Sequence, residues 1–486
     1  MITVSMNESQ FEYDIHSLLR EFFPKEEVKF CVEKEREEGT VLHLNVEYEE
    51  DKITIAVLSE EETWQQEVKI DQCERKEVKN RLKRLLYQMM KEKTAHTLPW
   101  GTLSGIRPTK IVLNELLQGA SEEETAQMMR ECYYASEDKI KLSMEIAKRE
   151  KQLLEQTDYE DGYSIYIGIP FCPSTCLYCS FPSNPLGRWE KRMGEYLTAL
   201  EKEIDFFKEK MSHKRLNTIY IGGGTPTTLS PEQLQRLIYK LKTSFDLTNL
   251  KEFTIEAGRP DSITREKLRV LKQEEIGRIS INPQTMKQKT LDIIGRWHTV
   301  EQTEEAFYLA RELGFDTINM DMIVGLPNED EQDVRDTLEA LKRLAPDNLT
   351  VHSLAIKRAA KLQMFKEEYV NLKSENSAAI MNMTQDYAQQ MGMSPYYLYR
   401  QKNMTGNMEN VGYATPGKAG LYNVLIMEER QTILAMGAAA STKIVYQSGE
   451  VVKRVENVKD VELYLTRIDE MIEKKYKALV EAGVCL

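Results

Sequence analysis

The sequence predicts an α/β fold, with an incomplete (β/α)6 barrel, a small α+β domain before it and an α/β extension after it. Three observations support this prediction. Six apolar runs alternate with amphipathic segments in the middle of the chain, short alternating strands precede them, and long amphipathic helices follow them. Because there are six parallel strands, we expect the sheet to stay open. The runs are SIYIGI (164–169), NTIYIGG (217–223), EFTIEA (252–257), RISINPQ (278–284), DTINMDMIVGL (316–326) and NLTVHSLAI (348–356).

Residues 1–95 are predicted to form a small α+β accessory domain. The segments MITVSM, VKFCVEKE, VLHLNVEYE and KITIAVLS alternate apolar and polar residues, as half-buried antiparallel strands do. Two amphipathic helices, FEYDIHSLLREFF and ERKEVKNRLKRLLYQMMKEK, are expected to pack on one face. His16 and His43 are isolated, so we expect core or surface histidines. We interpret this domain as a docking or oligomerisation module.

Residues 96–158 are predicted to form a helical connector. It begins with a turn-like stretch, PWGTLSGIRPTK at 99–110, in which Gly and Pro interrupt regular structure. Trp100, Arg107 and Lys110 either contact an anionic aromatic ligand or belong to a structural turn that seals a domain interface.

The barrel, residues 159–360, carries a cysteine motif directly after its first strand. Cys172, Cys176 and Cys179 form a C-x3-C-x2-C pattern in YIGIPFCPSTCLYCSF. Three thiolates can bind three irons of a [4Fe-4S] cluster and leave the fourth iron open to an exchangeable ligand. The alternatives are a zinc site, which normally needs a fourth ligand, and three buried structural thiols. Four further cysteines are scattered and are interpreted as core or surface thiols: Cys31, Cys73, Cys132 and Cys485.

Other suggestive residues follow later strands, at the edge where catalytic groups of such barrels collect. The run GGGTPT (222–227) follows strand two, and its missing Cβ atoms let the backbone approach a ligand. Glu256 ends strand three, Gln284 ends strand four, and Asp321 lies inside strand five. An acidic residue in an apolar strand is costly unless it is paired or reaches a ligand. Asp321 therefore either faces a ligand or pairs with a neighbouring basic residue.

These motifs resemble those of the radical S-adenosylmethionine (SAM) superfamily, in which C-x3-C-x2-C follows a strand and an aromatic residue, here Tyr178, precedes the third cysteine. The resemblance implies a [4Fe-4S] cluster whose open iron is chelated by SAM, and cleavage of SAM to a 5′-deoxyadenosyl radical. For Tyr166 the alternative is an ordinary strand aromatic. The SAM contacts implied by the resemblance are Tyr166, Tyr178, Gly223, Gly224, Thr225, Glu256, Gln284, Arg296 and Asp321.

Within that superfamily, TIEAGRPD, SINPQTM, IIGRWHT and MDMIVGLP resemble the coproporphyrinogen-type branch. The resemblance implies a tetrapyrrole substrate, a reductant such as flavodoxin or ferredoxin, and oxygen-independent oxidative decarboxylation of coproporphyrinogen III to protoporphyrinogen IX. A heme chaperone and an anaerobic heme-modifying methyltransferase remain alternatives, because all share the SAM half of the site. Two positions depart from the branch. Gly168 replaces a usual histidine, and Phe181 stands where another cysteine is usual. The sequence singles out no catalytic residue.

Residues 361–486 are predicted to form a substrate-side and cover region. Just before it, Lys357 and Arg358 are candidates for binding substrate carboxylates, or they begin a solvated helix. Tyr399 and Arg400 resemble the branch's substrate side, with plain packing as the alternative. The final helix, VELYLTRIDEMIEKKYKALVEAG, is expected to cover the barrel.

Composition argues against several classes of protein. A net charge of −13 over 486 residues disfavours broad binding to nucleic acid or anionic membranes. No apolar run reaches the roughly 18 residues of a membrane span, and the start MITVSMNESQ lacks the pattern of a signal peptide, so we expect a cytoplasmic protein without a membrane span. Seven cysteines in such a chain are not a disulfide framework.

Overall fold

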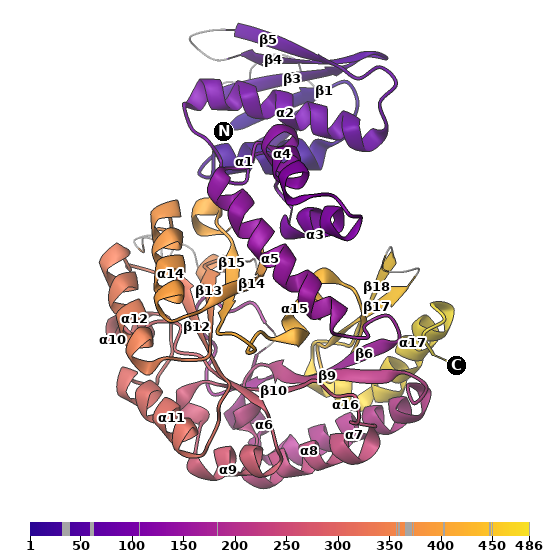
Figure 1. The fold of residues 1–486 in the computed structure, drawn as a ribbon, viewed down its shortest axis with the longest axis vertical. Helices are drawn as coiled ribbons and strands as arrows, with labels where there is room; N and C mark the ends of the chain where they lie inside the picture. Colours follow the sequence, from indigo (N-terminus) through magenta and orange to yellow (C-terminus); the bar gives the residue numbers. More distant parts are fainter. Residues whose placement is uncertain are drawn as a thin grey trace. The chain divides into compact units, whose positions relative to one another are not determined.

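The structure is a computed structural model that describes residues 1–31, 39–58, 63–105, 107–181, 183–355, 357, 360–364, 372, 374–401, 404–446, 449 and 451–485. It divides into two compact units, Met1–Lys148 and Arg149–Leu486. The boundaries predicted at residues 95 and 158 do not coincide with this division, and the finer domain assignment stays a prediction. Figure 1 shows the elements of each unit.

The first unit contains a five-stranded sheet in the order β2-β1-β3-β4-β5. Its core is apolar and shared with helices α1 and α2. The buried His43 lies between the hydroxyls of Thr3 and Ser5, with its Nδ1 2.7 Å from Thr3 Oγ1, so it is a core histidine. The elements are β1 (Ile2–Met6), α1 (Glu12–Phe22), β2 (Val28–Cys31), β3 (Leu42–Tyr48), β4 (Lys52–Leu58), β5 (Thr63–Lys69) and α2 (Arg75–Thr94).

Two expectations for this unit were wrong. β1 pairs in parallel with both β2 and β3, whereas antiparallel pairing was expected. A parallel pair needs a crossover, and α1 supplies one between β1 and β2. β5 was not predicted as a strand, because TWQQEVK is mostly polar. It is an edge strand whose side chains alternate between exposed and half-buried.

Three helices follow α2 in the chain, and the last of them crosses the division at Lys148: α3 (Thr109–Leu117), α4 (Glu122–Tyr133) and α5 (Glu137–Glu155). Helix α4 begins with a capping box between Ser121 and Glu124, which satisfies its first free backbone N–H groups. Trp100 is buried, and Lys139 Nζ lies 5.8 Å from its ring centroid. This burial favours the structural interpretation of the turn over a ligand contact through Trp100.

The second unit is built on an eleven-stranded sheet in the order β14-β15-β13-β12-β11-β10-β9-β6-β16-β17-β18. Six neighbouring strands are parallel and follow the chain order predicted from the sequence. They are β6 (Gly162–Ile169), β9 (Arg215–Gly223), β10 (Glu252–Gly258), β11 (Arg278–Ile281), β12 (Ile318–Val324) and β13 (Asn348–Ser353).

Helices between these strands lie along the outside of the curved sheet (Figure 1). Among the described strands β13 does not pair with β6, so the barrel is open and the predicted fold class is confirmed. The helices are α6 (Leu186–Trp189), α7 (Met193–Lys210), α8 (Pro231–Ser244), α9 (Arg265–Gln273), α10 (Gln288–Ile293), α11 (Val300–Glu312) and α12 (Glu331–Leu344).

The C-terminal region extends both edges of the sheet. β15 pairs antiparallel with β13 and β14 with β15, while β16 pairs in parallel with β6 and carries the β17–β18 hairpin. Its elements are α13 (Lys361–Met364), α14 (Ala378–Gln390), β14 (Ser394–Tyr399), β15 (Asn410–Ala414), α15 (Leu421–Glu428), β16 (Thr432–Met436), β17 (Ser441–Tyr446), β18 (Val451–Glu456), α16 (Val461–Thr466) and α17 (Ile468–Glu481).

A fully buried ion pair fastens the final helix to the barrel. Lys475 of α17 donates to Glu203 of α7, and neither side chain is exposed. Glu203 also accepts hydrogen bonds from the Tyr464 hydroxyl (2.7 Å) and the Gly437 amide (2.9 Å). Such a pair is stable only when its remaining hydrogen-bonding groups are satisfied, as they are here.

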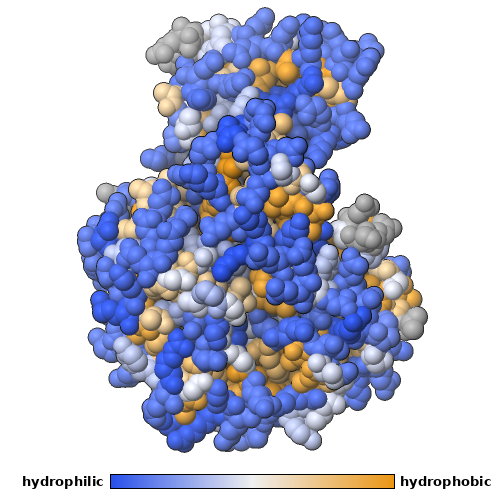
Figure 2. Space-filling view, viewed as in Figure 1, coloured by the Kyte–Doolittle hydropathy of each residue, from blue (hydrophilic) through white to orange (hydrophobic). Residues whose placement is uncertain are grey.

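The face of the molecule that Figure 2 shows is mainly hydrophilic. Apolar residues form small patches on the face seen in Figure 2. Within the described ranges, no helix is long and apolar enough to cross a membrane.

Candidate radical SAM site

The cysteine loop is held against the ends of the parallel strands. The short strand β7 (Phe171–Cys172) pairs with β8 (Asn184–Pro185) and closes the two sides of the loop. In the middle of the loop, the Leu177 amide donates to the Ile294 carbonyl at 2.9 Å. All three loop cysteines are free; Cys176 is buried, and Cys172 and Cys179 are half-buried.

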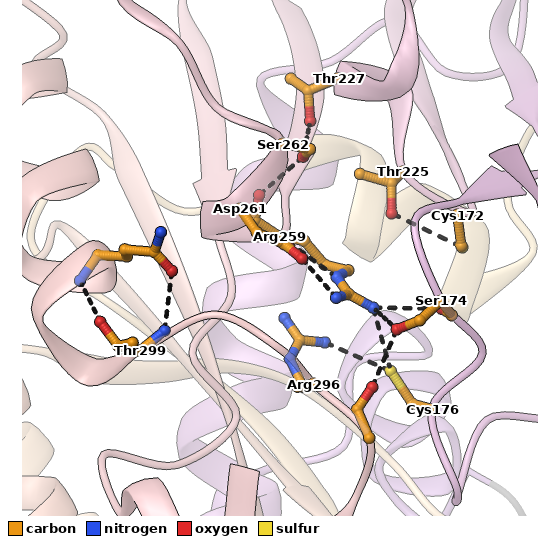
Figure 3. Close-up of polar contacts among 12 residues, drawn as sticks. Cys172, Ser174, Cys176, Thr225, Thr227, Arg259, Asp261, Ser262, Arg296 and Thr299 are labelled. Atoms are coloured by element: carbon orange, nitrogen blue, oxygen red, sulfur yellow. Dashed lines mark hydrogen bonds and ion pairs between the residues drawn. The ribbon is translucent and has the colours of Figure 1, made fainter. Parts of the chain in front are cut away.

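Hydrogen-bond donors surround the cysteine sulfurs (Figure 3). Arg259 Nη1 and Arg296 Nη1 lie 4.0 and 3.9 Å from Cys176 Sγ, and Thr225 Oγ1 lies 3.6 Å from Cys172 Sγ. Burial raises the pKa of the Cys172 thiol to about 11, against the opposing effect of Thr225. The two guanidinium groups thus place N–H donors beside a single sulfur.

The sulfurs do not form a site for one metal ion. Among the residues that the structure describes, no three His, Cys, Asp or Glu side chains are arranged to hold a single ion. A zinc site needs such convergence, whereas the thiolates of a cluster bind different irons. Three free cysteines in one loop, with cationic donors behind them, fit a [4Fe-4S] cluster better than a single ion.

The glycine turn packs against the beginning of the cysteine loop. The Gly224 amide donates to the Ile169 carbonyl and the Thr225 amide to the Phe171 carbonyl, both at 2.8 Å. A Cβ atom on Gly224 would lie 2.5 Å from the Phe171 carbonyl oxygen, and Gly223 has a φ of +107°. Only glycine fits these two positions without displacing the loop.

Glu256 is half-buried, two residues before the end of β10. The Tyr220 hydroxyl donates to its Oε1 at 2.6 Å. Burial raises the pKa of Glu256 to about 7, the neighbouring Asp321 adds to the rise, and hydrogen bonds from Tyr220 and the Gly223 amide oppose it. The carboxyl group therefore changes its charge near neutral pH.

Asp321 lies inside β12 as expected, but its charge is stabilised. Burial alone would raise its pKa, yet His352, Asn319 and Thr350 outweigh burial and hold the pKa below its usual value. Asn319 Nδ2 donates to Oδ1 at 2.7 Å, and His352 Nε2 lies 3.8 Å from Oδ2. The basic neighbour considered for Asp321 is thus His352, which does not exclude a ligand contact, since 19% of the Asp321 side chain is exposed.

Gln284 does not end a strand. β11 stops at Ile281, and Gln284 forms an isolated bridge to Met322 in a left-handed conformation with φ 69°. The backbone N–H of Gln284 donates to the backbone carbonyl of Asp321 at 3.0 Å, which ties the turn to β12. Within the described part of the chain its buried Oε1 accepts no hydrogen bond. A ligand hydroxyl can supply the missing donor.

Three tyrosines stack beside Glu256. The rings of Tyr166 and Tyr220 have centroids 6.2 Å apart, and Tyr422 of α15 lies 4.4 Å from Tyr220. Tyr178 lies on the other side of the cysteine loop, where Arg296 Nη1 approaches its hydroxyl at 3.4 Å. The structure thus separates the two predicted aromatic contacts, one near the glycine turn and one near Arg296.

The predicted substrate residues are dispersed. Lys357 is half-buried beside the cysteine loop, with Nζ 5.8 Å from the Phe181 ring, and burial lowers its pKa while nearby Cys179 opposes this shift. Tyr399 lies near Asp321, with its hydroxyl 3.4 Å from His352 Nδ1. Arg400 is buried with 3% exposure. Arg358 lies outside the described residues.

Comparison with known proteins identifies the family. Residues 166–341 match the Radical SAM superfamily. The oxygen-independent coproporphyrinogen-III oxidase-like protein HemZ of Bacillus subtilis (strain 168) is 41% identical over 83% of this chain and 81% of its own length. The chain belongs to the HemZ family of radical SAM proteins. Its cofactors are accordingly a [4Fe-4S] cluster and SAM.

Other relatives of this HemZ-family chain carry two different functional names. The heme chaperone HemW of B. subtilis is 39% identical over 40% of this chain and 50% of its own length. The oxygen-independent coproporphyrinogen III oxidase of Salmonella typhimurium is 28% identical over 64% and 66%. The solved structure of coproporphyrinogen III oxidase (HemN) from Escherichia coli shares the fold, with a TM-score of 0.52 over 66% of this chain and 72% of that one, at 24% identity.

The structure shows what surrounds Gly168 and Phe181, the two positions that depart from the coproporphyrinogen-type branch. The carbonyl of Gly168 accepts a hydrogen bond from the Tyr196 hydroxyl at 2.6 Å. A Cβ atom on Gly437 would lie 2.5 Å from the same oxygen, so the β16–β17 turn packs closely on this residue. Phe181, in place of a cysteine, exposes 65% of its surface and carries Lys357 over its ring.

Four residues of the site were missed from the sequence: Tyr220, Arg259, His352 and Tyr422. Tyr220 and His352 lie in predicted strands near the glycine turn and Asp321, so the strand prediction could have identified them as site residues. Arg259 lies in the quoted motif TIEAGRPD but was not singled out. Tyr422 had no local signal, because only the folding of α15 brings it onto Tyr220.

Proposed function

We propose that this protein is a radical SAM enzyme that decarboxylates coproporphyrinogen III to protoporphyrinogen IX without oxygen. The observation that carries the proposal is one cluster of polar contacts: the cysteine loop, the glycine turn and the half-buried Glu256 meet at one edge of the parallel sheet. The names of the HemZ and coproporphyrinogen oxidase relatives supply the substrate class.

In this proposal Cys172, Cys176 and Cys179 hold the cluster. When bound, the cluster and SAM would supply the electron and the radical chemistry that removes a hydrogen atom from a substrate propionate; CO2 would then leave, and an external electron acceptor would take the remaining electron, once for each of the two propionates. The backbone of Gly223 and Gly224 and the hydroxyl of Thr225 lie beside the loop, where they can orient the SAM amino group.

Four polar side chains are assigned to the rest of SAM. Glu256 and Asp321 are acceptors for its ribose or amino group, and the unpartnered Oε1 of Gln284 is a further acceptor. Arg296 is a donor for the SAM carboxylate, from a position already beside Cys176. Tyr166 and Tyr178 flank these groups.

The substrate side is assigned to Tyr399 and Lys357, and Arg358 and Arg400 remain proposed partners of the propionate groups. The Tyr399 hydroxyl beside His352 can donate to a carboxylate. Lys357 lies beside the cysteine loop, where its charge can attract a tetracarboxylate to an otherwise acidic protein. A flavodoxin or ferredoxin is the proposed reductant.

A heme chaperone is the second candidate, favoured by the 39% identity to HemW over 40% of the chain. A heme-modifying methyltransferase is a third outcome of the same test. The protein is reconstituted without oxygen, reduced, and incubated with SAM and either coproporphyrinogen III or heme, with Cys176→Ser as control. Protoporphyrinogen IX, CO2 and 5′-deoxyadenosine are expected. Heme transfer or a methylated or opened heme, without protoporphyrinogen, would overturn the proposal.

A further inference from the structure

Arg259 is a buried arginine that the proposed SAM site does not use. It follows β10 directly, after a register shift between Glu256 and Gly258, and it is 3% exposed. Asp261 holds the guanidinium with two hydrogen bonds, from Nε to Oδ1 at 3.0 Å and from Nη2 to Oδ2 at 2.6 Å. This two-point geometry fixes the plane of the group.

The remaining nitrogen of Arg259 points at the cysteine loop (Figure 3). Nη1 donates to the Ser174 hydroxyl at 2.6 Å and to the Ser174 carbonyl at 3.2 Å, and it lies 4.0 Å from Cys176 Sγ. Ser174 is itself held in place, because its hydroxyl donates to the Gly295 carbonyl at 2.9 Å. Arg259 therefore links the end of β10 to the segment between the first two cysteines.

The turn that carries Arg259 is itself braced. The Ser262 hydroxyl donates to the Arg259 carbonyl at 2.7 Å, and the Thr227 hydroxyl donates to the Ala257 carbonyl at 2.5 Å. The hydroxyl oxygens of Thr227 and Ser262 are 2.6 Å apart. Backbone and side chain of Arg259 are thus both held by contacts within the chain.

We propose that Arg259 is a positioning residue that sets Cys176 in place and raises the reduction potential of the cluster. The inference rests on the proposed ligation by Cys176. A fixed positive charge and N–H donor beside a ligating sulfur stabilise the more negative, reduced cluster. Low local polarity strengthens the effect, since Arg259 and Cys176 are both buried.

Arg296 also approaches Cys176, but the same Nη1 approaches the Tyr178 hydroxyl and its Nη2 donates to the Asn282 carbonyl, on the side assigned to SAM. Arg259 places its resolved hydrogen bonds on Asp261 and Ser174. Arg259 is the arginine that we expect to change the reduction potential of the cluster even when SAM is absent. The test is therefore made on the SAM-free protein.

The variants are Arg259→Gln, Arg259→Lys and Asp261→Asn, with Arg265→Gln as control. Arg265 is an exposed arginine paired with Glu312 at 2.6 Å, so its loss removes one charge at the surface. Iron and sulfide are measured first, and the potential is then measured by redox titration followed by electron paramagnetic resonance. No substrate or turnover is involved.

In Arg259→Gln we expect the ratio of reduced to oxidised cluster at a fixed potential to fall about tenfold. This corresponds to a midpoint about 59 mV more negative for one electron. Arg259→Lys keeps the charge and should shift less, Asp261→Asn should change the potential because the guanidinium loses its clamp, and Arg265→Gln should match the parent.

Each possible result of these measurements supports or contradicts a stated part of the inference. Arg259→Gln with a full cluster and the parent's potential would overturn the inference. If Arg259→Gln folds, as judged by circular dichroism, but binds little iron, the positioning role is supported. If it does not fold, the inference stands only if Arg259→Lys and Asp261→Asn show the intermediate shifts. A parent protein that binds no cluster would instead refute the proposed function.

Discussion

The SAM half and the substrate half of the barrel are assembled differently. In the SAM half, most assigned groups, such as Glu256 and Asp321, lie in or just after a parallel strand and are held by neighbouring side chains, here Tyr220 and Asn319. In the substrate half, Tyr399 ends β14, an added strand joined to β13 only through the antiparallel strand β15, and Lys357 follows β13. A common strand edge suits a cofactor shared by a superfamily, whereas added elements can differ with substrate.

His352 joins the two halves. Its ring lies 3.8 Å from the Asp321 carboxylate through Nε2 and 3.4 Å from the Tyr399 hydroxyl through Nδ1. If the halves act separately, variants in one should leave ligand binding in the other unchanged. The predictions below test this separation, beginning with the largest expected effect.

Removing a cluster ligand should abolish the chemistry of both halves. With Ser at position 172, 176 or 179 in place of cysteine, we expect iron to fall from about four per chain to near zero. Formation of 5′-deoxyadenosine should be lost with it, as measured by iron analysis and chromatography. Cys73→Ser, a half-buried cysteine of the first unit, is the control. A loop variant that keeps the parent's cluster signal would show that its cysteine is not a ligand.

Breaking the buried ion pair should affect stability but neither ligand. Lys475→Met leaves Glu203 buried without its cation, which typically costs about 3 kcal/mol or more. The free energy of unfolding is measured by urea titration. Lys453→Met breaks an exposed pair with Glu481 and should cost about 1 kcal/mol or less. Equal losses in the two variants would contradict the assigned importance of the buried pair.

In the SAM half, Glu256→Gln and Asp321→Asn should weaken SAM binding and keep the cluster. Loss of a hydrogen bond to a charged group costs about 1.5 to 3 kcal/mol, or roughly tenfold to a hundredfold in affinity. Calorimetry on the reconstituted protein measures the change. Unchanged SAM affinity in both variants would assign these carboxylates to the scaffold.

Glu256 also predicts a pH dependence of stability. Its pKa is about 7 in the folded protein and 4.5 as a free side chain, so the folded state binds this proton more tightly. The stabilisation is complete below about pH 4.5 and is lost as pH rises through about 7, with a slope approaching about 1.4 kcal/mol per pH unit. Glu256→Gln should remove this contribution from the urea-unfolding profile of the SAM-free protein. An identical profile in the variant would mean that the carboxyl group does not hold the proton.

In the substrate half, the smallest effect is expected from Tyr399→Phe. Removing one hydroxyl should weaken coproporphyrinogen binding by about 0.5 to 1.5 kcal/mol, roughly twofold to tenfold, with SAM affinity unchanged. Tyr239→Phe, with 64% exposure, is the matched control. An equal loss of SAM affinity would show that His352 couples the halves and that their separation is wrong.

Sequence patterns alone predict the parallel core, which the structure confirms, and the SAM half, which stays a prediction. Strands alternating with helices place the cysteine loop, the glycine turn, Glu256 and Asp321 along one edge, because parallel strands all end on the same side. The open six-stranded barrel and the C-terminal extension were predicted and confirmed. Local periodicity and motif spacing are sufficient for such features.

Only the tertiary structure decided the features that depend on contacts distant in sequence. Parallel pairing of β1, the polar edge strand β5 and the bridge at Gln284 arise from neighbours that periodicity does not reveal. The same holds for Lys357 beside Phe181 and for Arg259 held between Asp261 and Ser174. The position of a charged side chain depends on the groups that pair with it, and those groups come from separate segments of the chain.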